Sequence, residues 1–209
     1  MNIDFTKYNH IAILGGTFNP VHNGHIHMAK NVLKCYTEIE AVCLMPNNLT
    51  AYKDNSLVVS NEDRLNMLRL AIRDEKGLYL SGLDIYRGGI TYTIDTIRDI
   101  KEINSDIAID FIIGADSLLT FTKWYCYEKL LGLCRLIVIR RGCEAKELFE
   151  AKNKLLKINN CSQIEITDIT EYPASSTEIR NRLKKGERHI PELNKEVFDY
   201  IKENKLYVG

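Results

Sequence analysis

The sequence of 209 residues lacks a net charge, because 28 lysines and arginines balance 28 aspartates and glutamates. Without an excess of positive charge, the chain has no general attraction for nucleic acid or for an anionic membrane surface. We therefore expect neither a nucleic-acid partner nor a membrane partner. Any phosphate group that the protein binds must be held by a local group of residues.

The sequence also lacks long apolar runs. No run approaches the roughly 20 apolar residues that are needed to cross a bilayer. The first ten residues, MNIDFTKYNH, lack the apolar core of a secretory signal. These absences predict a cytoplasmic protein.

Cysteines with the spacing of a metal site are missing as well. The six cysteines are spread through apolar segments without a C-x-x-C pair, at Cys35, Cys43, Cys126, Cys134, Cys143 and Cys161. Isolated thiols of this kind are typical of reduced core side chains, and nothing in the sequence marks one of them as a nucleophile. Since no third ligand stands near the histidines either, the sequence predicts no protein-bound metal.

What the sequence does contain is an alternation of short apolar runs, rich in β-branched residues, with longer amphipathic segments. The predicted strands are 10–14, 40–45, 78–85, 107–113, 136–140 and 164–169. Apolar residues recur at helical spacing over 26–36, 62–73, 93–103 and 146–156. This order predicts an α/β fold with a Rossmann-like, doubly wound parallel sheet.

The last part of the chain departs from this alternation. Two predicted helices, 176–184 and 192–204, follow Pro173. Because no linker rich in glycine, serine or proline precedes them, we expect one domain over residues 1–209, with a helical extension over about 175–209. The extension could pack internally or against another subunit, so both a monomer and a homo-oligomer stay open.

A glycine-rich segment with two histidines follows the first predicted strand. Its residues are Gly15-Gly16-Thr17-Phe18-Asn19-Pro20-Val21-His22-Asn23-Gly24-His25. Glycines let a ligand approach the backbone, and the following helix start offers unpaired N–H groups and a partial positive charge to an anion. Two imidazoles three residues apart at a helix start lie on the same side of the helix and can donate hydrogen bonds to phosphoryl oxygens. The segment is neither a Walker A loop nor a G-x-G-x-x-G fingerprint, and it predicts a phosphate site.

This segment resembles the signature of the H-x-G-H nucleotidylyltransferase superfamily, especially that of the bacterial nicotinate mononucleotide adenylyltransferases. Aspartate is common in that family where this chain has Asn19. The resemblance implies that the phosphate of nicotinate mononucleotide takes the adenylyl group of ATP and that pyrophosphate is released, a step of NAD biosynthesis. It also implies that His22 and His25 are catalytic and that ATP contacts Gly15, Gly16, Thr17, Phe18, His22 and His25.

A second element of the resemblance lies near the C-terminus. Ser175-Ser176-Thr177-Glu178-Ile179-Arg180 stands at the start of a predicted helix, and Ser175 and Glu178 have the spacing of a capping box. The segment is similar to the family's Ile-Ser-Ser-Thr-x-Ile-Arg motif, with Ala174 in the first place. The resemblance implies that Ser176 and Arg180 bind the β- and γ-phosphates of ATP, that Ser175 also contacts ATP and that Arg180 is catalytic.

Further segments resemble parts of the same family. Tyr92-Thr93-Ile94-Asp95-Thr96 is similar to its Tyr-Thr-x-Asp-Thr element, and Ile113-Gly114-Ala115-Asp116-Ser117-Leu118 is similar to its Gly-Ala-Asp segment. The resemblance implies ATP contacts at Gly114 and Asp116. It implies an acceptor site formed by Asn47, Lys53, Tyr92, Thr93 and Trp124.

Two residues keep two interpretations each. Trp124 is either an ordinary core residue or a surface on which a pyridine ring stacks. Arg64, in a predicted helix that agrees with the family, is either structural or directed toward a substrate.

The resemblance implies Mg²⁺ as the cofactor, bound together with ATP and held largely by phosphates and water. The nearest alternative is another branch of the superfamily, such as pantetheine-phosphate adenylyltransferase or a cytidylyltransferase. A module that senses ATP or a pyridine nucleotide without turnover is an alternative from a different class. Identification of the product distinguishes the three.

Overall fold

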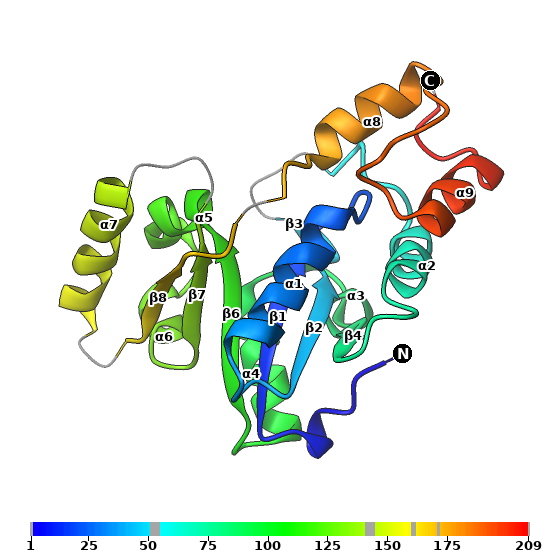
Figure 1. Cartoon of the computed structure of the whole chain (residues 1–209). Coiled ribbons are helices and arrows are strands. Elements are labelled where there is room, and N and C mark those ends of the chain that lie inside the picture. Colours follow the sequence, from blue (N-terminus) through cyan, green and yellow to red (C-terminus); the bar gives the residue numbers. More distant parts are fainter. Residues whose placement is uncertain (1, 51–54, 141–144, 160–161, 171, 209) are drawn as a thin grey trace.

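The computed structural model describes residues 2–50, 55–140, 145–159, 162–170 and 172–208. Its centre is a six-stranded parallel sheet with the strand order β4-β2-β1-β6-β7-β8 (Figure 1). The strands are β1 (His10–Gly16), β2 (Ala41–Pro46), β4 (Leu78–Leu80), β6 (Ala108–Gly114), β7 (Arg135–Ile139) and β8 (Ile164–Thr167). The sheet grows from β1 toward one edge and then from β6 toward the other. The predicted doubly wound α/β fold is therefore confirmed.

Helices cover both faces of this sheet because its strands alternate their apolar side chains between the faces. In β1, Ala12 and Leu14 belong to one buried cluster, whereas Ile11 and Ile13 belong to another. The first cluster includes residues of α1, α2, α8 and α9, and the second includes residues of α4 and α7. These helices are α1 (Asn23–Cys35), α2 (Asn61–Ala71), α4 (Thr93–Ile103), α7 (Ala145–Ile158), α8 (Ser176–Lys184) and α9 (Lys195–Glu203). Among the described residues, no helix has the length and apolar character to cross a membrane.

One strand prediction is wrong past Leu80. The sequence predicts a strand over 78–85, but β4 ends at Leu80, and Leu83–Arg87 forms the short helix α3. The hydroxyl of Ser81 accepts a hydrogen bond from the N–H of Leu83 at 3.2 Å, which turns the chain. The guanidinium of Arg87 then pairs with Asp84 at 2.7 Å, a contact that the i,i+3 spacing of a helix allows.

The structure also contains short elements that the sequence pattern does not predict. They are β3 (Leu49–Thr50), β5 (Ile90–Thr91), α5 (Ala115–Leu119), α6 (Tyr127–Leu130) and the 3₁₀ turns η1 (Phe5–Lys7) and η2 (Phe121–Lys123). β3 and β5 form a separate parallel pair, in which Thr50 lies opposite Thr91. Elements this short do not show a hydrophobic period in a sequence.

The two predicted C-terminal helices both form, and α9 lies beside α2 (Figure 1). Val197 and Ile201 of α9 are buried in the same cluster as Leu65 of α2. The hydroxyl of Tyr200 on α9 donates a hydrogen bond to the carboxylate of Asp63 on α2 at 2.9 Å. That residues 1–209 fold as one domain stays a prediction.

Candidate active site

A cavity of about 710 Å³ lies at the carboxyl ends of β1 and β6. The chain builds the sheet in opposite directions from these two neighbouring strands, and ligands of open α/β sheets bind at such a point. Several residues that the sequence predicts to contact ATP line the cavity: Gly15, Gly16, Thr17, His22, His25, Gly114 and Asp116. The structure therefore brings the segments after β1 and β6 together.

The two histidines of the first motif lie at the start of α1. His22 is the N-cap residue, and His25 lies in the first turn. Their rings stack, with centroids 3.8 Å apart. The Nδ1 atom of His25 accepts a hydrogen bond from the backbone N–H of His22 at 3.2 Å. Because a neutral imidazole has one donor and one acceptor nitrogen, this bond leaves Nε2–H as the donor of His25.

Phe18 lies behind this pair of histidines. The residue is 1% exposed, and its ring meets the ring of His25 edge-on, with centroids 4.9 Å apart. Its φ of 48° places the backbone in the left-handed region, so the loop turns sharply here. The side chain of Phe18 therefore supports His25, and only the backbone of this residue is left to contact a ligand.

The C-terminal motif lies against the same loop. The hydroxyl of Ser176 donates to the carbonyl of Pro20 at 2.9 Å, and Nη1 of Arg180 donates to the carbonyl of Asn19 at 2.7 Å. In the described structure, Ser175, Ser176 and Arg180 do not belong to the cavity lining. Ser175 is the N-cap residue of α8, but its side chain makes no capping hydrogen bond there, so the capping box is not formed. The predicted triphosphate residues thus adjoin the loop, and two of them bind its backbone.

Arg64 of α2 holds the loop from another side. None of its surface is exposed, and Nη1 donates to the carbonyl of Thr17 at 2.9 Å. Nη2 donates to Oδ1 of Asn61 and, at 3.5 Å, to the carbonyl of Asn48. Within the described part of the chain, Arg64 forms no salt bridge, and burial lowers the pKa of its guanidinium. These contacts favour the structural interpretation of Arg64.

The end of β6 contributes a carboxylate to the cavity. Gly114 is the N-cap residue of α5, and Asp116 lies in the first turn. A Cβ atom on Gly114 would come within 2.6 Å of Oδ1 of Asp116. The glycine therefore leaves the space that this carboxylate occupies.

The predicted acceptor residues gather around the start of α4. Tyr92 is the N-cap residue of this helix and Thr93 is its first residue. Both line the cavity together with Asn47 and Trp124. Trp124 is half-buried and packs on the rings of two phenylalanines, so it is part of the core and of the cavity wall at once. Lys53 lies outside the described residues.

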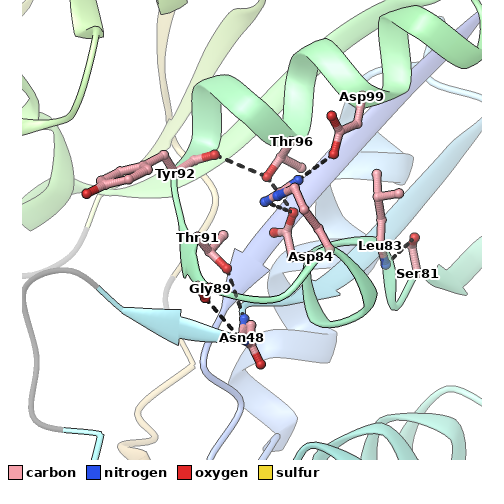
Figure 2. A network of polar contacts seen from close by, with 10 residues as sticks. Asn48, Ser81, Leu83, Asp84, Gly89, Thr91, Tyr92, Thr96 and Asp99 are labelled. Atoms are coloured by element: carbon pink, nitrogen blue, oxygen red, sulfur yellow. Dashed lines mark hydrogen bonds and ion pairs between the residues drawn. The ribbon is translucent and has the colours of Figure 1, made fainter.

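A polar network stands behind this wall (Figure 2). Asp84 of α3 lines the cavity, is 3% exposed and accepts hydrogen bonds from Thr96 and Arg87, each at 2.7 Å. Arg87 also donates to Asp99 at 2.6 Å, and the hydroxyl of Thr96 lies 3.4 Å from the carbonyl of Tyr92. The network therefore ties α3 to the start of α4.

Sequence reasoning missed Asp84, Arg87 and this role of Thr96. The signal that could have indicated this ion pair is the i,i+3 spacing of Asp84 and Arg87 on a helix. The prediction of a strand over residues 78–85 hides that spacing. Burial raises the pKa of Asp84, while the hydroxyl of Thr96 and the charge of Arg87 act in the opposite direction.

Replacing Thr96 with valine is expected to lower stability more at neutral than at acidic pH. Burial already raises the pKa of Asp84 in the folded protein. The hydroxyl of Thr96 stabilises the charged form of Asp84, so its loss raises the folded-state pKa of Asp84 further. When the pKa of Asp84 is higher in the folded than in the unfolded protein, ionisation of Asp84 lowers the free energy of unfolding. This loss grows as the pH rises from the pKa of the unfolded state toward that of the folded state. We expect a loss of about 2 kcal/mol near pH 7 and less than half of that near pH 4, measured by urea unfolding.

Thr122→Val is the matched control, because Thr122 is exposed. It should change the free energy of unfolding by less than about 0.5 kcal/mol at both pH values. An equal loss for Thr96→Val at both pH values would show that the hydroxyl does not act through the charge of Asp84.

Burial makes two of the described cysteines poor nucleophiles. Cys43 and Cys134 are buried as predicted, and burial raises the pKa of both thiols, to about 12 for Cys134. Cys126 is half-buried. The prediction of a core position is wrong for Cys35, which ends α1 and is exposed. Two further cysteines, Cys143 and Cys161, lie outside the described residues.

The chain is similar to known proteins over nearly its whole length. A family model described as cytidylyltransferase-like matches residues 13–182. A probable nicotinate-nucleotide adenylyltransferase of Listeria innocua is 34% identical over 197 residues, which cover 94% of this chain and 96% of that protein. A protein of the same name from Borreliella burgdorferi is 38% identical over 200 residues, which cover 95% and 96%.

Solved structures show the same fold. The nicotinic acid mononucleotide adenylyltransferase of Plasmodium falciparum complexed with NaAD matches with a TM-score of 0.78 and 21% identity, over 96% of this chain and 98% of that one. The same enzyme complexed with APC matches with a TM-score of 0.74, the same identity and the same coverage.

Proposed function

Since the chain belongs to the cytidylyltransferase-like family, and among its members to the nicotinate-nucleotide adenylyltransferases, we propose that the cavity holds ATP and nicotinate mononucleotide together. The protein is an enzyme of NAD biosynthesis that converts these substrates to nicotinate adenine dinucleotide and pyrophosphate. The observation that carries the placement is the stacked pair of His22 and His25 at the start of α1, at the point where the sheet changes direction.

On the donor side, the triphosphate of ATP lies along the loop after β1. Gly15, Gly16 and Thr17 offer backbone groups, and the N-terminus of α1 adds a partial positive charge. His22 and the Nε2–H of His25 donate to oxygens of the α-phosphate. Gly114 and Asp116 contact ATP from the end of β6.

The leaving pyrophosphate lies toward the start of α8. Ser175 and Ser176 stand there with the N-terminus of the helix, and Arg180 follows one turn later. Nη1 of Arg180 is bound to the carbonyl of Asn19, so its charge is fixed next to the loop. That position lets Arg180 neutralise charge that develops on the departing phosphates.

The chemistry needs little more than positioning and neutralisation of charge. The phosphate of nicotinate mononucleotide is already ionised, so no general base has to create the nucleophile. One of its oxygens attacks the α-phosphorus of ATP in line. The bond from that phosphorus to the oxygen that bridges to the β-phosphorus breaks, and pyrophosphate leaves with the electron pair. No bond to the protein forms.

On the acceptor side, the pyridine ring lies between the start of α4 and Trp124. The N–H groups at Tyr92 and Thr93 begin a helix of 11 residues and attract the carboxylate of nicotinate. The face of Trp124 stacks on the ring, and Asn47 contacts the mononucleotide. Lys53 binds its phosphate in this proposal.

Magnesium, bound together with ATP, would be held mainly by phosphate oxygens and water. Among the described residues, no three histidine, cysteine, aspartate or glutamate side chains gather as a metal site. The cavity nevertheless has carboxylates at Asp84 and Asp116, and Mg²⁺ commonly uses one or two carboxylates together with substrate phosphates. Asp116 is the better candidate, because Asp84 is already bound by Thr96 and Arg87. The ion supplies neutralisation of the phosphate charge.

We further propose the cytoplasm, where ATP is available, as the compartment.

Release of pyrophosphate from ATP and Mg²⁺ in the presence of different acceptors tests the assignment. We expect kcat/KM to be at least about tenfold higher for nicotinate mononucleotide than for nicotinamide mononucleotide, because a site that binds an anion discriminates against a neutral amide. Turnover with phosphopantetheine alone would contradict the acceptor and indicate another branch of the family. Failure with all three would contradict the enzyme and favour a nucleotide sensor.

A further inference from the structure

Asn19 is a buried polar residue in the loop that follows β1, and it is 5% exposed. Its side chain uses both its donor and its acceptor. Nδ2 donates to the carbonyl of Leu57 at 2.9 Å, and Oδ1 accepts from the N–H of Val59 at 3.3 Å. Oδ1 also accepts from the hydroxyl of Tyr207 at 2.7 Å. One amide thus joins the loop after β1, the segment between β3 and α2, and the C-terminal residues.

The segment that Asn19 binds is connected to the cavity through Val58, which lies between Leu57 and Val59. Val58 donates through its N–H to the carbonyl of Asn55 at 3.2 Å. The side chain of Asn55 then holds Thr50 at both ends: Oδ1 accepts from the N–H of Thr50 at 3.0 Å, and Nδ2 donates to its carbonyl at 3.1 Å. Thr50 belongs to β3 and lines the cavity. Asn19 is therefore connected to the cavity wall through the backbone from Leu57 to Val59 and the side chain of Asn55.

Thr50 belongs to the part of the cavity wall that we assign to the acceptor. Thr50 lies opposite Thr91 in the pair of β3 and β5, and β5 leads directly to Tyr92 at the start of α4. Figure 2 shows Asn48, just before β3, bound to the hydroxyl of Thr91, and that hydrogen bond is 2.9 Å long. A shift of β3 would therefore shift the start of α4 with it.

We propose that Asn19 is a positioning residue that fixes the acceptor wall, through Leu57 and Val59, relative to the loop that binds ATP. The inference rests on the proposed function, since it assigns the two sides of the cavity to the two substrates. The acceptor wall binds nicotinate mononucleotide, so a displacement of this wall relative to the loop weakens the binding of that substrate and leaves the binding of ATP largely unchanged.

Aspartate is common at this position in the family, but in this chain the side chain meets the carbonyl of Leu57 as well as the N–H of Val59, so it both donates and accepts. A carboxylate of the same shape could still accept from Tyr207, but it would repel the carbonyl of Leu57, because it has no proton to donate. This repulsion would push the segment away and loosen the bond from the N–H of Val59. Burial raises the pKa of Tyr207, which keeps its hydroxyl protonated and able to donate.

Asn19→Asp tests the proposal, because it keeps the shape and removes one donor. We expect the KM for nicotinate mononucleotide to rise about tenfold, which corresponds to roughly one lost hydrogen bond. We expect kcat and the KM for ATP to change by less than about threefold, since Arg64, Arg180 and Ser176 still hold the loop backbone. Hydrogen exchange at the Val59 amide should become about tenfold faster.

Asn204→Asp is the matched control, because the amide of Asn204 also donates to a carbonyl, that of Tyr200 at 2.9 Å, at the end of α9. It should leave both KM values and the exchange at Val59 unchanged. Tyr207→Phe removes only the bond from the C-terminal side and should raise the acceptor KM by a smaller factor.

Equal increases of both KM values, or unchanged values with Asn19→Asp, would overturn the proposal. A loss of stability without any change in the KM values of the folded enzyme would overturn it too. Failure of the wild-type chain to use any acceptor would instead contradict the proposed function, and the exchange at Val59 would still test the contact itself.

Discussion

His25→Ala is expected to lower kcat by about 100- to 1000-fold, the loss that follows removal of one donor to a developing negative charge. The bond from the N–H of His22 to Nδ1 fixes the ring so that Nε2–H is the donor. Stacking on His22 and edge-on contact with Phe18 hold the ring in place. Because the α-phosphate gains charge in the transition state, the loss should appear in kcat and much less in the KM for nicotinate mononucleotide.

His27→Ala provides the matched control on the same helix. Nε2 of His27 bonds to the carbonyl of Thr170 at 2.8 Å, and the residue does not line the cavity in the described structure. We expect its kcat to stay within about twofold of the wild type. If His25→Ala loses stability in proportion to its turnover, or if both variants lose equal activity, His25 is structural and the proposed role fails.

Arg64→Met is the second substitution for which we expect a large effect. The substitution removes the donor that binds the carbonyls of Thr17 and Asn48 and the side chain of Asn61. It also removes the buried positive charge next to the loop after β1. Removal of the charge also removes its cost of burial, which offsets part of the loss. We expect the free energy of unfolding to fall by about 2 kcal/mol and kcat/KM for ATP to fall about 100-fold. Urea unfolding and steady-state kinetics measure the two effects.

Arg69→Met is the control from the same helix, because Arg69 is exposed and donates to Asn66 at 2.7 Å. It should change stability by less than about 0.5 kcal/mol. Arg64→Lys keeps the charge but loses the planar fork, and we expect its kcat/KM to stay at least about tenfold below the wild type. Full activity of the lysine variant would show that the contacts to the loop carbonyls are dispensable.

The part of the site that the sequence predicts is the part that follows long strands. The segments after β1 and β6 contain Gly15 to His25 and Gly114 to Asp116, and parallel strands place their carboxyl ends at one edge of a sheet. Strong periodicity locates the strands, so the motifs behind them fall into one cavity. The same reasoning places α8 correctly over Ser176–Lys184.

The remainder of the site depends on contacts between segments that no local pattern reveals. Arg180 and Ser176 meet the carbonyls of Asn19 and Pro20, residues more than a hundred positions earlier in the chain. The sequence identifies Asn19 only as a departure from a family motif, whereas the structure shows why an amide fits there. Such long-range bonds are fixed by the packing of α2 and α8 around the loop.

The acceptor wall is the least predictable region, because β3, β5 and α3 are too short to carry a hydrophobic period. Apolar residues over 78–85 suggest a continuous strand, and the turn at Ser81 breaks it. The role of Asp84 follows only once α3 and α4 are placed side by side.

Transfer of label from ATP that is labelled at the α-phosphorus tests the central claim most directly. With nicotinate mononucleotide and Mg²⁺, we expect all transferred label in nicotinate adenine dinucleotide, one unlabelled pyrophosphate for each dinucleotide, and none bound to the protein. Label on the protein, or label released as AMP without any dinucleotide, would contradict direct in-line transfer between two substrates held in this cavity.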